Sequence, residues 1–99
     1  MVGSIPSAER SLLGEKVMND IVIADVLEER RRQGRVWGKQ NYSPLEWLPI
    51  LCEEIGEVSK EVCEGYFQNK TTDNYRVELV QAAAVIVAMI ENLDSGEEV

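Results

Sequence analysis

The chain has no histidine among its 99 residues, which removes the commonest general base and the commonest zinc ligand. It has only two cysteines, Cys52 and Cys63. They lie about three helical turns apart, roughly 16 Å, which is too far for a disulfide within one helix. We expect either small buried hydrophobic side chains or free thiols in a reducing compartment. Carboxylates are therefore the groups that we expect to carry any acid–base or metal chemistry.

Long apolar runs and an excess of basic residues are also absent. The longest apolar run, residues 82–90, is too short to cross a bilayer, and residues 1–17 lack the basic and apolar regions of a signal peptide. We therefore expect a soluble, cytoplasmic protein with no membrane partner. The 18 acidic and 10 basic residues give a net charge of −8, which argues against nucleic acid as a partner. An acidic protein can still handle phosphates through metal ions.

The length suits one small domain. We assign residues 1–19 to an N-terminal extension or leader, residues 20–94 to a helical domain and residues 95–99 to a tail. The first helix is predicted over residues 20–33, with Asp20 in position to cap it. A loop with two glycines is predicted to follow over residues 34–42.

The strongest local signal is the sequence Ser43-Pro44-Leu45-Glu46. Serine at the N-cap, proline at the first helical position and glutamate at the third form a capping box. It predicts a second helix that ends near Gly65, with an irregularity at Pro49.

The third helix is predicted from Thr72 or Asp73 to about Leu93. From Leu79 to Ile90 every residue except Gln81 is apolar. A helix that is apolar all round must be covered on all sides, and two other helices of so small a chain cannot cover it completely. We therefore expect a homo-oligomer, either a dimer or a tetramer, assembled through this helix.

Carboxylates interrupt both apolar helices. Glu53, Glu54 and Glu57 fall on one side of the second helix, and Glu78 and Gln81 on one side of the third, since residues three and four apart share a helix face. If the helices pack antiparallel, the carboxylates converge. Such crowding is tolerated around a hard divalent cation, and oxygen ligands suit Mg²⁺ or Mn²⁺. The alternatives are a solvated helix face, a charge that favours the helix dipole at Glu78, and an interface amide at Gln81.

These segments together resemble the MazG-like, all-α nucleoside triphosphate pyrophosphohydrolases. The family signature is EExxE followed, after a spacer, by ExxD. Glu53, Glu54 and Glu57 match its first half, Glu78 opens the second half, and Gln81 stands where the pattern has aspartate. The stretches at residues 29–33 (ERRRQ) and 37–40 (WGKQ) also look like those of short, phage- and mobile-element-type members.

The resemblance implies an all-α fold whose antiparallel helices form a four-helix-bundle-like oligomer. It also implies Mg²⁺-dependent cleavage of nucleoside triphosphates to a monophosphate and pyrophosphate. By position, Glu54, Glu57 and Glu78 would be metal ligands, and Glu53 would help hold a second ion or orient the attacking water. Gln81 can still ligate through its amide oxygen, but it brings no charge.

The remaining candidates are substrate contacts. Trp37 is either a core anchor or a stacking surface for a base, and the basic stretch is either solvated or in contact with phosphate and base. Arg32 and Lys39 are the preferred triphosphate contacts. The substrate-binding set is Arg32, Gln33, Trp37, Lys39 and Lys60.

Two functions of different class follow. One is a nucleotide pyrophosphohydrolase that clears or balances (deoxy)nucleoside triphosphates, with Glu53, Glu54, Glu57 and Glu78 as catalytic residues. The other is a non-catalytic helical oligomer that keeps the fold as a binding or regulatory module. Gln81 favours the second function, and the four glutamates favour the first.

Overall fold

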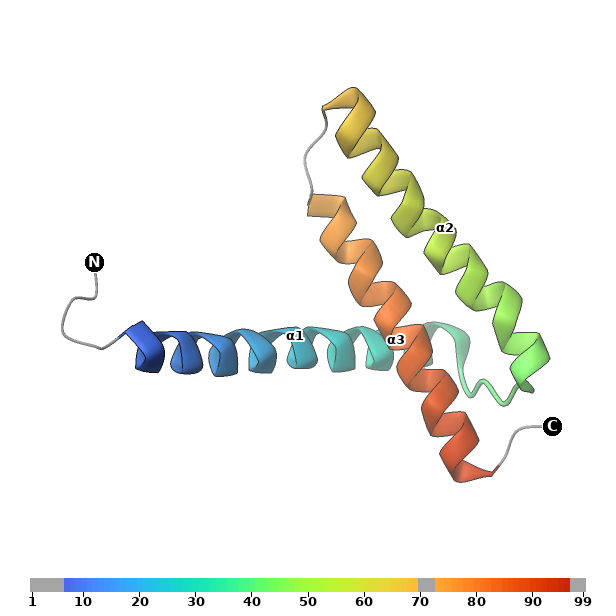
Figure 1. Ribbon diagram of the computed structural model, residues 1–99. Helices are drawn as coiled ribbons and strands as arrows, with labels where there is room; N and C mark the ends of the chain where they lie inside the picture. Colours follow the sequence, from blue (N-terminus) through green and yellow to red (C-terminus); the bar gives the residue numbers. More distant parts are fainter. Residues whose placement is uncertain (1–6, 70–72, 97–99) are drawn as a thin grey trace.

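The computed structural model describes residues 7–69 and 73–96, and the side chains from residue 14 onward. These residues form three α-helices and no strand, as Figure 1 shows. Helix α1 is Ser7–Trp37, α2 is Pro44–Gln68 and α3 is Asp73–Ser95. The all-α class is therefore confirmed.

Helix α1 is much longer than predicted. It begins at Ser7 and not at Asp20, and it continues to Trp37, so both the predicted cap and half of the predicted loop are wrong. Residues 7–19 contain no proline and a single glycine, so nothing in the sequence interrupts a helix there. The helix ends at Gly38, where φ is 72° and the amide donates a hydrogen bond of 2.9 Å to the Gly34 carbonyl. Gly38 is therefore the left-handed cap.

Helix α2 begins as predicted, with a complete capping box. The Ser43 Oγ accepts from the Glu46 amide at 3.3 Å, and the Glu46 carboxylate accepts from the Ser43 amide at 3.0 Å. The helix runs through Pro49 and past Gly65 to Gln68. It stops at Asn69, whose left-handed φ of 55° is one that asparagine tolerates.

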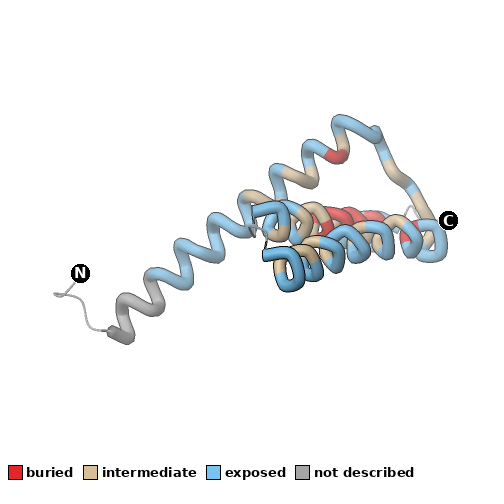
Figure 2. The backbone as a smooth tube through the Cα atoms, turned by 90° about the horizontal axis from the view of Figure 1, so that it is seen from above, coloured by how far each residue is buried: buried red, intermediate tan, exposed pale blue. Residues whose placement is uncertain are grey.

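Helix α3 is the element against which the rest of the chain packs. It contacts both α1 and α2, whereas within the described ranges α1 and α2 do not pack against each other. Figures 1 and 2 show α2 antiparallel to α3 and α1 crossing α3. The helix starts at Asp73, which lies in its first turn, and Thr72, the other residue predicted as a possible cap, lies outside the described residues. Its buried residues are Ala82, Ala84, Val85, Ala88 and Asn92.

The core centres on Trp47, whose side chain is 3% exposed and contacts Val85 and Ala88. Its indole N–H donates to the Oδ1 of Asn92 at 2.8 Å, and the backbone amide of Tyr42 donates to the same oxygen at 3.0 Å. The Asn92 amide group donates to Asn41 at 3.0 Å. One buried asparagine therefore joins the end of α3 to the start of α2 and to the segment before it.

Replacing Asn92 should destabilise the fold strongly. In Asn92→Ala the Trp47 indole and the Tyr42 amide both lose their acceptor, and each unsatisfied buried donor costs about 1–3 kcal/mol. We expect the free energy of unfolding to fall by about 2–4 kcal/mol in urea denaturation. The matched control is Asn74→Ala, on the exposed first turn of α3. Equal stability of the two variants would contradict the role given to Asn92.

Candidate functional site

The glutamates predicted to converge do influence one another across α2 and α3. The pKa of Glu54 is raised above its usual value, first by burial and then by repulsion from Glu78, Glu53 and Glu57. Burial also raises the pKa of Glu78, and the charge of Glu57 raises it further. The antiparallel packing of α2 and α3 thus brings negative charge from both helices to one region.

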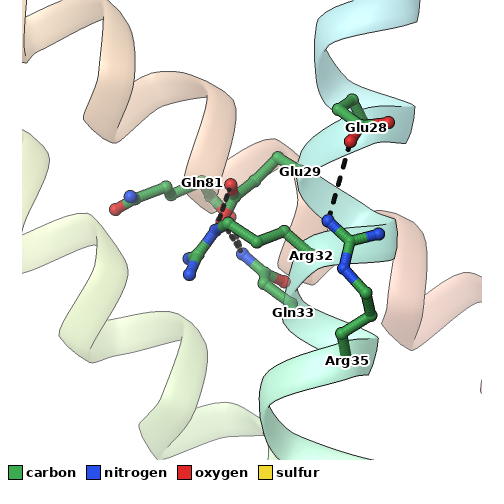
Figure 3. A network of polar contacts seen from close by, with 6 residues as sticks. All are labelled: Glu28, Glu29, Arg32, Gln33, Arg35 and Gln81. Atoms are coloured by element: carbon green, nitrogen blue, oxygen red, sulfur yellow. Dashed lines mark hydrogen bonds and ion pairs between the residues drawn. The ribbon is translucent and has the colours of Figure 1, made fainter.

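Helix α1 adds a carboxylate that the sequence reasoning missed. Glu29 contributes to the raised pKa of Glu54, so it faces the same region. Its carboxylate accepts two hydrogen bonds of 2.8 Å from Arg32 and one of 3.0 Å from Gln33 (Figure 3). The bonds from Arg32 lower the pKa of Glu29. The hydrogen bonds within α1 could have been predicted from the sequence, because residues 29, 32 and 33 share one face of a helix, whereas the approach of Glu29 to Glu54 could not.

Gln33 is buried in the contact between α1 and α3, with 2% of the residue exposed. Its amide nitrogen donates to Glu29 and, at 3.3 Å, to the backbone carbonyl of Gln81. Both hydrogen bonds fix the position of Glu29 relative to α3. The side chain of Gln81 is half-buried, and Figure 3 shows it pointing away from those of Glu29 and Arg32.

The basic candidates lie on different sides of the glutamates. Lys60, on α2, lowers the pKa of Glu78 by its charge, which opposes the repulsion from Glu57. The pKa of Arg32 is raised, first by its hydrogen bond to Glu29 and to a smaller extent by the charge of Glu54. Lys39 lies on the exposed connection between α1 and α2. Arg32 and Lys60 therefore border the carboxylates from two helices.

A hollow of about 390 Å³ adjoins two of the glutamates. Its lining includes Glu53, Glu54, Trp37 and Gln40. Trp37 is 53% exposed, so the core anchor is Trp47 and the indole face of Trp37 is accessible. An aromatic ring, an amide and two carboxylates thus share one concave surface.

The two cysteines lie elsewhere on α2 and are exposed free thiols. The alternative that they are small buried hydrophobic residues is wrong. Among the described residues, no helix is long and apolar enough to cross a membrane.

The donor set suits a hard cation, because the neighbouring side chains offer only carboxylate and amide oxygens. In the part of the chain that the structure describes, however, no three Asp, Glu or Cys side chains stand close enough together to hold a metal ion. Mutual repulsion of like charges favours such separation. The glutamates are neighbours, and binding a cation would require their side chains to move closer together.

Comparisons of the chain with models of protein families, with curated proteins and with solved structures found no match. The class that the fold and site define is an all-α protein with a carboxylate-rich region between α2 and α3, bordered by α1.

The raised pKa of Glu54 predicts a specific dependence of stability on pH. A carboxyl group whose pKa is higher in the folded state destabilises the fold when it is ionised. The free energy of unfolding therefore decreases as the pH rises from the usual carboxyl pKa through the raised pKa of Glu54. It recovers as the pH falls below the usual carboxyl pKa. At pH 7 we expect Glu54→Gln to have a higher thermal midpoint than the native protein, and the difference should shrink on acidification.

The control is Glu15→Gln, on the exposed first half of α1, whose thermal midpoint should stay within about 2–4 °C of the native value, as is usual for surface substitutions. A Glu54→Gln variant that melts below the native protein at pH 7 would show that the ionised carboxylate stabilises the fold.

Proposed function

We propose that this protein is a Mg²⁺-dependent nucleotide pyrophosphohydrolase that cleaves (deoxy)nucleoside triphosphates to a monophosphate and pyrophosphate. The observation that carries the proposal is the shared surface of Glu53, Glu54 and Trp37, to which α3 adds the charge of Glu78. Carboxylates next to an accessible aromatic ring suit a ligand with metal-bound phosphates at one end and a flat base at the other. Arg32 and Lys60 supply positive charge at the border.

Each side chain has its own proposed role. Glu54, Glu57 and Glu78 would hold Mg²⁺, which when bound neutralises phosphate charge and lowers the pKa of a coordinated water. Glu53 would orient the attacking water and accept its proton, a role open to a carboxylate in a chain without histidine. Arg32 and Lys60 bind the phosphate oxygens, with Lys39 as a further contact, and Trp37 stacks on the base. Gln33 acts indirectly, since its amide holds Glu29.

Two observations favour a second function. Gln81 stands where the family signature has aspartate, and no three carboxylates of the described residues are in position to bind a cation. A non-catalytic helical oligomer that binds or regulates a partner is therefore the alternative. The two proposals differ in whether nucleotides are cleaved.

The native protein, incubated with Mg²⁺ and a panel of nucleoside and deoxynucleoside triphosphates, should release pyrophosphate from at least one of them. Glu57→Gln should abolish release while the fold stays intact, because removing one crowded carboxylate relieves repulsion. Glu64→Gln, two turns further along α2, is the matched control and should remain active. A native protein inactive on the whole panel would favour the binding module, and unfolding of Glu57→Gln would give the cluster a structural role.

Gln81→Asp tests the one departure from the signature. If Gln81 reaches the metal, an anionic ligand should tighten Mg²⁺ binding by about 1–2 kcal/mol. The half-saturating Mg²⁺ concentration should then fall roughly tenfold for each 1.4 kcal/mol. Unchanged Mg²⁺ dependence with a lower thermal midpoint would instead indicate a buried, unpaired charge at a helix interface.

A further inference from the structure

The chain alone leaves much apolar surface open. Its radius of gyration is 17.3 Å, whereas a compact domain of this length has about 13 Å. The first half of α1 projects beyond the other two helices, as Figures 1 and 2 both show. It carries what we name the α1 ridge: Val17, Met18 and Ile21, which are 58%, 66% and 53% exposed. These three residues lie on one side of the helix.

A second apolar surface lies between the start of α2 and the end of α3. This α2–α3 groove has a volume of about 380 Å³ and includes Leu51, Ile86, Ile90 and Leu93 in its lining. Ile86, Ile90 and Leu93 are 42%, 52% and 61% exposed. The lining contains no charged residue. Its one amide side chain, Asn92, is already hydrogen-bonded to three neighbours, so the groove suits an apolar occupant.

The ridge cannot enter the groove of its own chain. Along α1, Val17 lies about 30 Å from Trp37 at 1.5 Å per residue. Tyr42, which lines the groove, follows Trp37 by five residues and lies within about 18 Å of it. Val17 and Tyr42 are therefore at least roughly 12 Å apart, and within the described residues α1 does not pack against α2, which forms one wall of the groove. An α1 ridge that enters this groove must therefore belong to another molecule.

We propose that the α1 ridge of one copy occupies the α2–α3 groove of a second copy, and that the exchange is mutual. A two-fold axis makes both contacts at once, because each copy offers one ridge and one groove. The arrangement covers Ile86, Ile90 and Leu93 of α3 together with the ridge on the projecting half of α1. It names the two surfaces behind the expected homo-oligomer and does not depend on nucleotide hydrolysis.

Substitutions on the two surfaces should have the same effect on assembly. Sedimentation velocity of the native protein at micromolar concentration should give a dimer. Ile21→Asp and Ile90→Asp should each weaken dimerisation by ~100-fold or more, since either one puts an unpaired charge into the apolar contact. Val62→Asp, on a part of α2 outside both surfaces and similarly exposed at 48%, is the matched control and should remain dimeric. Circular dichroism should show that all three variants remain helical.

Cross-linking identifies the partners directly. In a background with Cys52→Ser and Cys63→Ser, a Met18→Cys protein mixed with an Ile90→Cys protein should form a disulfide-linked heterodimer on mild oxidation. A native monomer, or Met18→Cys chains that link only to one another, would overturn the proposal. A dimer without pyrophosphate release would overturn the proposed function alone, and an active monomer would overturn the exchange alone.

Discussion

Helix α3 packs against α1 and α2, which do not contact each other within the described residues, and this packing determines where the candidate site residues on the three helices lie. Ala82, Ala84 and Ala88 are buried on α3, and their small side chains permit close approach of neighbouring helices. Because α2 lies on one side and α1 crosses on another, carboxylates from all three helices come within electrostatic reach of Glu54. Polar contacts of two buried side chains help to fix the arrangement: Asn92 accepts from Trp47, and Gln33 donates to the Gln81 carbonyl.

This arrangement places carboxylates with raised pKa values near a carboxylate whose pKa is lowered. Glu54 and Glu78 have raised pKa values because burial and neighbouring carboxylates disfavour their ionised forms, whereas Glu29 has a lowered pKa because Arg32 donates to it. A region that destabilises its own ionised carboxylates gains most from a bound cation. Binding of the proposed phosphate ligand to so negatively charged a chain requires cations between them, from metal or from Arg32 and Lys60.

The sequence predicted the parts of the fold that local signals specify. The capping box at Ser43 fixed the start of α2, and the apolar composition of residues 79–90 identified the buried helix. Helix ends were harder to predict, because Gly34 and Gly65 are tolerated within helices when tertiary packing supports them. Helix periodicity predicted that Glu53, Glu54, Glu57 and Glu78 lie close together. The position of Glu29 near them depends on how α1 crosses α3, which no local sequence pattern encodes. Trp37 and Trp47 could be told apart only by burial.

The central claim is that these glutamates form a cation site, and calorimetric titration tests it most directly. Titration of Mg²⁺ or Mn²⁺ into the native protein should give a saturable heat of binding. That heat should disappear when Glu54, Glu57 and Glu78 are all replaced by glutamine, while circular dichroism shows that the triple variant is still helical. No saturable heat in the native protein, or the same heat in the triple variant, would contradict the account.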